Sequence, residues 1–73
     1  MTAATEIRVD LDRVHFALRS GDRWAVCKRL PDGSSDTLVA WSGGRRSLFH
    51  RLEALGIVPS RAAEEQLATL AES

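Results

Sequence analysis

The first half of the chain alternates between hydrophobic and polar positions, which is the pattern of β-strands with one buried face. The alternation runs from Ile7 to Asp12 and resumes from Val14 to Arg19. Two further stretches, Trp24 to Leu30 and Thr37 to Trp41, continue it. The connections between these stretches are too short to hold crossover helices, so we predict an antiparallel meander of three to four strands.

The turn between the second and third strands fixes how their side chains meet. Ser20-Gly21-Asp22 is predicted to form a three-residue turn, which pairs Arg19 with Arg23. In that register Phe16 and Leu18 share a face with Trp24 and Val26, and we expect the core on that side. His15 and Cys27 then meet on the opposite side.

The hydrophobic period changes to that of a helix after the Gly43-Gly44 pair. The next stretch places Leu48, Phe49, Leu52 and Leu55 on one stripe and ends at Gly56, a suitable C-cap. Ser60 is a suitable N-cap for a second helix, whose stripe is Ala63, Leu67, Leu70 and Ala71. We therefore predict a single α+β domain over 1–73, with two short C-terminal helices packed on one face of the sheet and residues 1–5 flexible.

Composition and charge exclude several classes of protein. The 73 residues are 44% hydrophobic and 27% charged, which is an ordinary globular composition. Ten Lys and Arg balance ten Asp and Glu, and this balance argues against strong non-specific binding of nucleic acid. A single cysteine excludes an internal disulfide, and no signal peptide or membrane-crossing run is recognised, so a cytoplasmic location is expected.

Catalysis has little support in the sequence. Cys27 and His15 form the one candidate nucleophile and base pair, and no third residue that would orient the histidine can be named. A metal site from His15, Cys27 and His50 lacks any local spacing signature. We therefore expect no enzyme activity, no cofactor and no metal.

The stretch Gly43-Gly44-Arg45-Arg46-Ser47 is the most suggestive of binding. Two glycines let the backbone approach a ligand closely, and the start of a helix offers unpaired amides. Arginines are unfavourable at that end of a helix unless an anion sits there, such as a phosphate or the carboxylates of a partner. The alternative is a plain strand-to-helix turn whose arginines point into water or pair with Asp36 or Glu53.

A second candidate site is the sheet face opposite the predicted core. It would carry His15, Arg19, Arg23 and Arg29, with Lys28 at its edge, and could lie against phosphates or an acidic protein surface. The alternative is a solvated face, which is common in antiparallel sheets. Trp41, beside the glycines, is expected in the core; the alternative is partial exposure, because so thin a domain cannot easily bury two tryptophans.

Two functions follow as hypotheses. The leading one is a small binding module of the inhibitor or adaptor type, comparable in size to accessory proteins of phages and mobile elements, that acts on a larger protein partner. A homodimer is also allowed. The alternative is nucleic-acid binding through the basic sheet face and the Gly43–Ser47 turn. A helix-turn-helix reading of 52–63 is disfavoured, because the second helix carries Glu64, Glu65 and Glu72 and would repel the DNA backbone.

Overall fold

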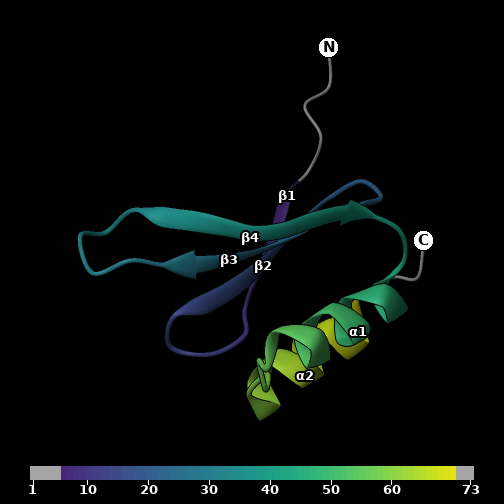
Figure 1. Ribbon diagram of the computed structural model, residues 1–73. Coiled ribbons are helices and arrows are strands. Elements are labelled where there is room, and N and C mark those ends of the chain that lie inside the picture. Colours follow the sequence, from purple (N-terminus) through teal and green to yellow (C-terminus); the bar gives the residue numbers. More distant parts are fainter. Residues whose placement is uncertain (1–5, 71–73) are drawn as a thin grey trace.

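The computed structural model describes residues 6–70 and contains four strands followed by two helices (Figure 1). The elements are β1 (Glu6–Asp10), β2 (His15–Ser20), β3 (Arg23–Arg29), β4 (Ser35–Ser42), α1 (Arg45–Leu55) and α2 (Arg61–Thr69). This confirms the predicted α+β meander with two C-terminal helices. The flexibility expected for 1–5 and the place of Ala71 in the second stripe lie outside the described residues.

The strands follow the simplest antiparallel order, β1-β2-β3-β4, so that each pairs with its neighbour in sequence. Both helices lie on one face of this sheet, as Figure 1 shows. Neither described helix lies over the other face. Among the described elements the molecule therefore has two layers, and the two faces of its sheet have different surroundings.

The register between β2 and β3 differs by one residue from the prediction. Ser20 pairs with Arg23, and Arg19 pairs with Trp24. The loop between them has two residues instead of three, and Gly21, at a φ of 64°, takes the first central position that such loops reserve for glycine. A slip of one residue moves every side chain of one strand to the other face relative to its partner. The predicted pairing of Arg19 with Arg23 is therefore wrong.

The core lies between the sheet and the helices. Trp24 and Trp41 are opposite one another on β3 and β4, and their indoles stack with centroids 6.4 Å apart and planes 11° from parallel. Trp41 is 8% exposed, so its expected place in the core is confirmed and the alternative of partial exposure is wrong. Its pairing with Trp24 turns it toward the helices, and the Arg51 guanidinium of α1 lies 5.2 Å from its ring. The whole core consists of Val9, Leu11, Ala17, Trp24, Val26, Trp41, Leu48, Leu52, Ile57, Ala63 and Leu67.

The helices use narrower hydrophobic stripes than the sequence predicts. On α1, Leu48 and Leu52 are buried, whereas Phe49 and Leu55 are 42% and 41% exposed. The predicted stripe was therefore too wide, because only the side of α1 that faces the sheet and α2 is covered. The predicted caps are confirmed: Gly56 ends α1 in the left-handed conformation, and the Ser60 side chain accepts a hydrogen bond from the start of α2.

Candidate functional site

The residues proposed for catalysis or metal binding are not assembled into a site. Because of the register, His15 pairs with Lys28 while Phe16 pairs with Cys27, so His15 and Cys27 point to opposite faces of the sheet. His50 is exposed on α1. Among residues 6–70 no group of three or more His, Cys, Asp or Glu side chains could hold a metal ion. The predicted meeting of His15 with Cys27 is therefore wrong.

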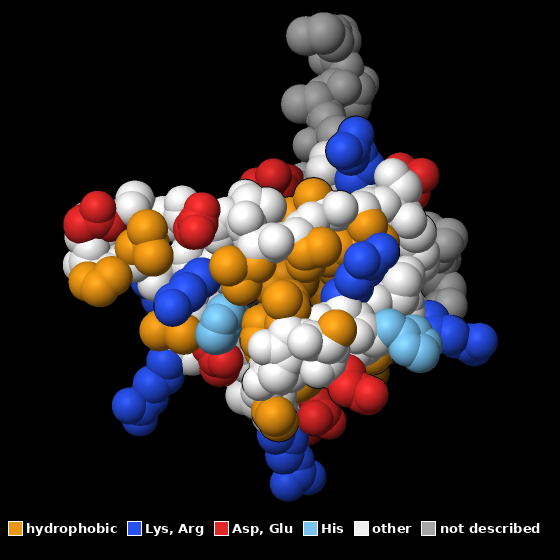
Figure 2. Space-filling view, in the orientation of Figure 1, with side chains coloured by type: hydrophobic (Ala, Val, Ile, Leu, Met, Phe, Trp, Pro, Cys, Tyr) orange, Lys and Arg blue, Asp and Glu red, His pale blue; other side chains and the backbone are white. Residues whose placement is uncertain are grey.

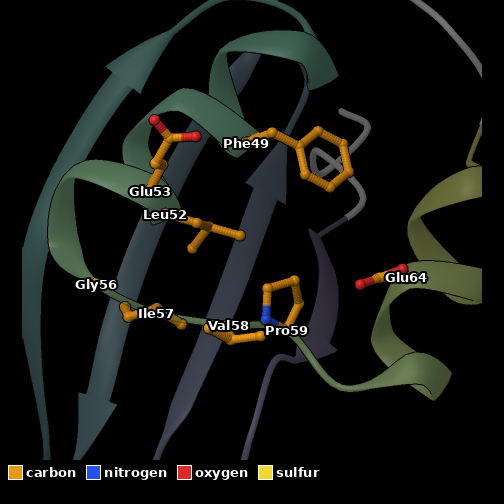
Figure 3. Close-up of a pocket in the computed structure, with 8 residues that line it drawn as sticks. All are labelled: Phe49, Leu52, Glu53, Gly56, Ile57, Val58, Pro59 and Glu64. Carbon is orange, nitrogen blue, oxygen red and sulfur yellow. The ribbon is translucent and has the colours of Figure 1, made fainter.

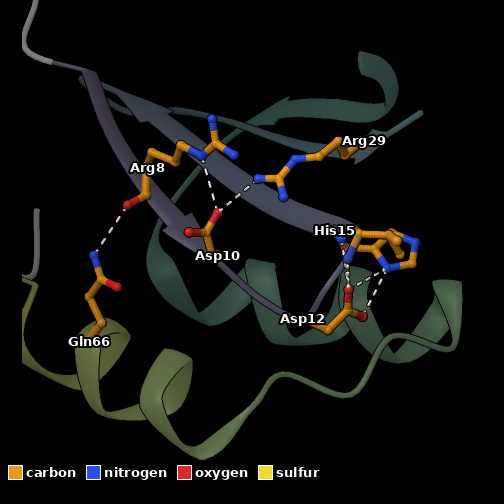
Figure 4. Close-up of polar contacts among 7 residues, drawn as sticks. Arg8, Asp10, Asp12, His15, Arg29 and Gln66 are labelled. Atoms are coloured by element: carbon orange, nitrogen blue, oxygen red, sulfur yellow. Dashed lines mark hydrogen bonds and ion pairs between the residues drawn. The ribbon is translucent and has the colours of Figure 1, made fainter. Parts of the chain in front are cut away.

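His15 instead takes part in the turn between β1 and β2 (Figure 4). One carboxylate oxygen of Asp12 accepts hydrogen bonds from the backbone N–H groups of Val14 and His15, at 2.8 and 2.7 Å. The other lies 2.9 Å from Nδ1 of the His15 ring. Partial burial alone would raise the pKa of Asp12, but these hydrogen bonds stabilise the charged form and leave the pKa below the ordinary 3.8. Asp12 therefore closes this turn as a carboxylate.

Replacing Asp12 with alanine is expected to destabilise the domain by about 1–2 kcal/mol near neutral pH, because two backbone donors lose their acceptor. The folded-state pKa is lowered, so the stabilisation by the charged carboxylate is present above pH 3.8 and is lost as the pH falls through the folded value. Urea unfolding at about pH 7 and about pH 2.5 measures this difference. A gap between variant and parent that stays the same in acid would contradict the role of the charge.

The glycine turn has the backbone that the sequence predicts at the start of a helix. Gly44 is the N-cap of α1, no side chain caps it, and the first turn contains no acidic residue. Gly43 has a φ of 153°, and a Cβ there would lie 3.0 Å from the Ser47 hydroxyl oxygen. That hydroxyl donates to the Gly44 carbonyl at 2.8 Å. Local geometry therefore explains Gly43, whereas Gly44 has a φ of −86° and open space around it, and anion binding at this turn stays a prediction.

The two arginines of this turn are only partly described. Arg46 is exposed on the first turn of α1. Arg45 begins the helix, and the direction of its side chain lies outside the described part. In this turn Gly43, Gly44 and Ser47 therefore lie close together, and Arg46 is exposed beside them.

The basic sheet face does not exist as one surface. Arg19 lies on the same face as Trp24, with its guanidinium carbon 5.5 Å from that ring. Arg23 and Arg29 lie on the opposite face, which no helix covers. The predicted grouping of Arg19 with Arg23 and Arg29 is therefore wrong, and the one-residue slip between β2 and β3 is the cause.

The face without a helix carries a hydrophobic strip that the sequence analysis missed. We call this whole side of the sheet the uncovered face. The register aligns Phe16, Cys27 and Thr37 in one row across β2, β3 and β4, and Leu18, Ala25 and Ala40 in the next. The charged residues of this face are Glu6, Arg8 and Asp10 on β1 and Arg23 and Arg29 on β3. A signal was available, because β2 and β3 are hydrophobic at consecutive positions, as in strands buried on both sides.

Charged side chains cover one end of the uncovered face. The Arg8 guanidinium lies 4.2 Å from the centre of the Phe16 ring, which is only 6% exposed. Arg8 also pairs with Asp10 at 3.1 Å, and Arg29 approaches the same carboxylate at 3.8 Å (Figure 4). Arginine over an aromatic ring shields it while leaving a positive charge at the surface. The phenylalanine is thereby hidden, and the guanidinium groups are presented instead.

The middle of the uncovered face is nearly flat. Ala40 is exposed, and Leu18 and Ala25 are half-buried. Cys27 is buried, with its sulfur 3.8 Å from the Thr37 hydroxyl. Small side chains leave this part of the sheet nearly flat, so a second surface could approach the strands closely.

Comparisons of the chain with family models, with curated proteins and with solved structures gave no match. Residues 6–70 form a small α+β domain whose four-stranded sheet has both described helices on one side. Neither described helix, of 11 and nine residues, has the length and hydrophobicity needed to span a membrane.

Proposed function

We propose that the chain is a non-enzymatic protein-binding module that docks on a larger partner through the uncovered face. One observation carries this proposal: the centre of the face is hydrophobic, although no described helix covers it. Antiparallel sheets with one solvated side normally present polar side chains there. The part of the strip that reaches the surface is Leu18, Ala25 and Ala40, and hydrophobic surface with a polar border is typical of interaction sites.

The charges around the strip favour an acidic partner surface. Arg8, Arg23 and Arg29 lie on the uncovered face, and its acidic side chains are Glu6 and Asp10, so basic side chains outnumber acidic ones there. Complementary charges steer two proteins together and fix their register. Carboxylates placed around a flat hydrophobic patch on the partner would match this arrangement.

Nucleic-acid binding is the second candidate, because the same arginines and the uncapped start of α1 could contact phosphates. Sheets that bind single strands usually stack bases on exposed aromatic rings. Phe16, the aromatic residue on this face among the described residues, is 6% exposed beneath Arg8. The hidden ring therefore favours a protein partner over a nucleic acid.

Site-specific photo-crosslinking tests this proposal. A photoreactive amino acid replaces Ala40, which is exposed on the uncovered face, and a control chain carries it at Ala62, which is exposed on α2. In cells that produce the protein, the Ala40 position is expected to give one protein adduct that resists nuclease. Arg23→Glu should reduce its yield about fivefold or more, because it reverses a complementary charge.

The other outcomes decide between the candidates. An adduct from the Ala40 position that disappears on nuclease treatment would favour nucleic acid. The same protein adduct from Ala40 and Ala62, or an adduct from Ala62 alone, would contradict docking through the uncovered face.

A further inference from the structure

We infer that the groove between the end of α1 and the start of α2 is a second docking site. Its occupant is an amphipathic segment of another protein that presents a large hydrophobic side chain beside lysine or arginine. This groove lies in the helical layer, on the side of the sheet away from the uncovered face. It is independent of the proposed function, because it uses different residues and selects the opposite charge.

The groove is formed where the chain reverses between the helices. Gly56 ends α1 with a φ of 73°, and the N–H of Ile57 turns back to the Leu52 carbonyl at 2.9 Å. At the other end, the N–H of Ser60 donates to the Leu11 carbonyl at 2.7 Å, which fixes the connection to the end of β1. Both ends of the connection are held, so the groove is largely formed before anything binds.

Hydrophobic side chains form the floor and walls of this groove (Figure 3). Leu52 and Ile57 are buried beneath it, and Phe49, Val58 and Pro59 stand around it. The volume is about 390 Å³, which is within the range of pockets that hold small ligands and large side chains. A single exposed hydrophobic residue is ordinary, but several around one hollow mark a docking surface.

Two of the hydrophobic side chains around the groove are exposed to solvent. Phe49 is 42% exposed and Val58 is 79% exposed. Neither contributes to the core, which α1 completes through Leu48 and Leu52. Covering both side chains would remove hydrophobic surface from water and is therefore favourable for binding.

Carboxylates on both sides of the groove specify a cationic occupant. Glu53 from α1 and Glu64 from α2 line it, and none of the described lining residues is cationic (Figure 3). Both glutamates are exposed, and within residues 6–70 neither forms an ion pair. Figure 2 shows acidic side chains beside hydrophobic ones at the base of the molecule, with a Lys or Arg side chain extending below them. Hydrophobic anchors in a groove with flanking charges are how amphipathic helices are commonly recognised.

The test uses a synthetic amphipathic peptide with leucines along one helical face and lysines beside them. Backbone amide signals of the isotope-labelled full chain are followed during its titration. We expect shifts at Phe49, Gly56 and Val58. Val58→Asp should weaken binding about tenfold or more, because it places a charge in the hydrophobic contact.

Reversing the charges of the two groove glutamates tests whether they select a cationic peptide. The double variant Glu53→Lys with Glu64→Lys is expected to bind the lysine peptide about fivefold more weakly and to prefer a matched peptide in which glutamates replace the lysines. Asp22→Lys with Asp36→Lys is the control, because it makes the same change in net charge at exposed positions in the β2–β3 turn and on β4. This control should leave the affinity within about twofold.

Several outcomes would overturn the inference. One is that no amide signal of the groove shifts at high peptide concentration. Another is that the signals of Ala25 and Ala40 shift instead. A third is that the charge-exchanged variant still prefers the lysine peptide. Groove signals that change with protein concentration alone would show that the occupant is a second copy. If Val58→Asp fails to fold, the charge exchange decides alone, since both glutamates are exposed. Failure here would leave the Ala40 crosslink unchanged, so the two proposals can fail separately.

Discussion

Alanine in place of Trp24 is expected to remove most of the stability of the domain. The Trp24 side chain is 2% exposed and stacks on Trp41 between the sheet and the helices. Replacing a buried aromatic residue with alanine costs about 3–5 kcal/mol. A chain of 73 residues has a total free energy of unfolding on the order of 4–11 kcal/mol. Urea unfolding followed by far-ultraviolet circular dichroism measures the loss.

Trp24→Phe is the matched control for this substitution. It keeps an aromatic ring in the core and removes the indole N–H, which is buried without a hydrogen-bond partner among the described residues. Burying an unpaired donor is itself unfavourable, so its removal offsets part of the lost packing. We expect Trp24→Phe to cost less than half as much as Trp24→Ala. Equal losses for both variants would show that ring packing is not the source of the stability.

Alanine in place of Leu67 is expected to cost about 2–5 kcal/mol and to release α2 from the sheet. Leu67 is fully buried, and with Ala63 it supplies the buried residues of this helix. A helix of nine residues is not stable in water without packing. Hydrogen exchange should therefore show α2 amides that lose protection while the strands keep theirs.

Leu55→Ala is the comparison for Leu67→Ala. Leu55 ends α1 and is 41% exposed, so the same truncation there should cost less than about 1 kcal/mol. Similar losses at the two positions, or a loss of protection in the strands before α2, would contradict the role given to Leu67.

The order and type of the elements could be predicted because the hydrophobic period changes once, at the Gly43-Gly44 pair. Their relative register could not. Phe16, Ala17 and Leu18 are all hydrophobic, so the alternation of β2 fits either face. The length of the loop at Gly21 decides between the two, and Ser20-Gly21-Asp22 is compatible with two or three loop residues.

The candidate sites also differ in whether they depend on local sequence or on how separate elements pack. The Gly43–Ser47 turn is a local feature, and the sequence identified it with its correct place before α1. Which side chains lie on the uncovered face depends on the register between β2 and β3. Because the predicted register was off by one residue, the sequence analysis predicted a basic surface that does not exist. The groove depends on where α2 returns against α1. Helical spacing alone placed Phe49 in the core stripe, although it follows Leu48 directly and so points about 100° away around the helix.

The contact between α2 and β1 has a consequence for how the chain folds during synthesis. The side-chain amide of Gln66 donates to the Arg8 carbonyl at 3.2 Å, across 58 positions of sequence (Figure 4). β1 is made before the other described elements, and α2, which covers it, is made after all of them. Contacts of such long range slow folding. Val9 and Leu11 therefore remain without their final cover until translation of α2 is complete, and a pause before that point would prolong their exposure to chaperones and proteases.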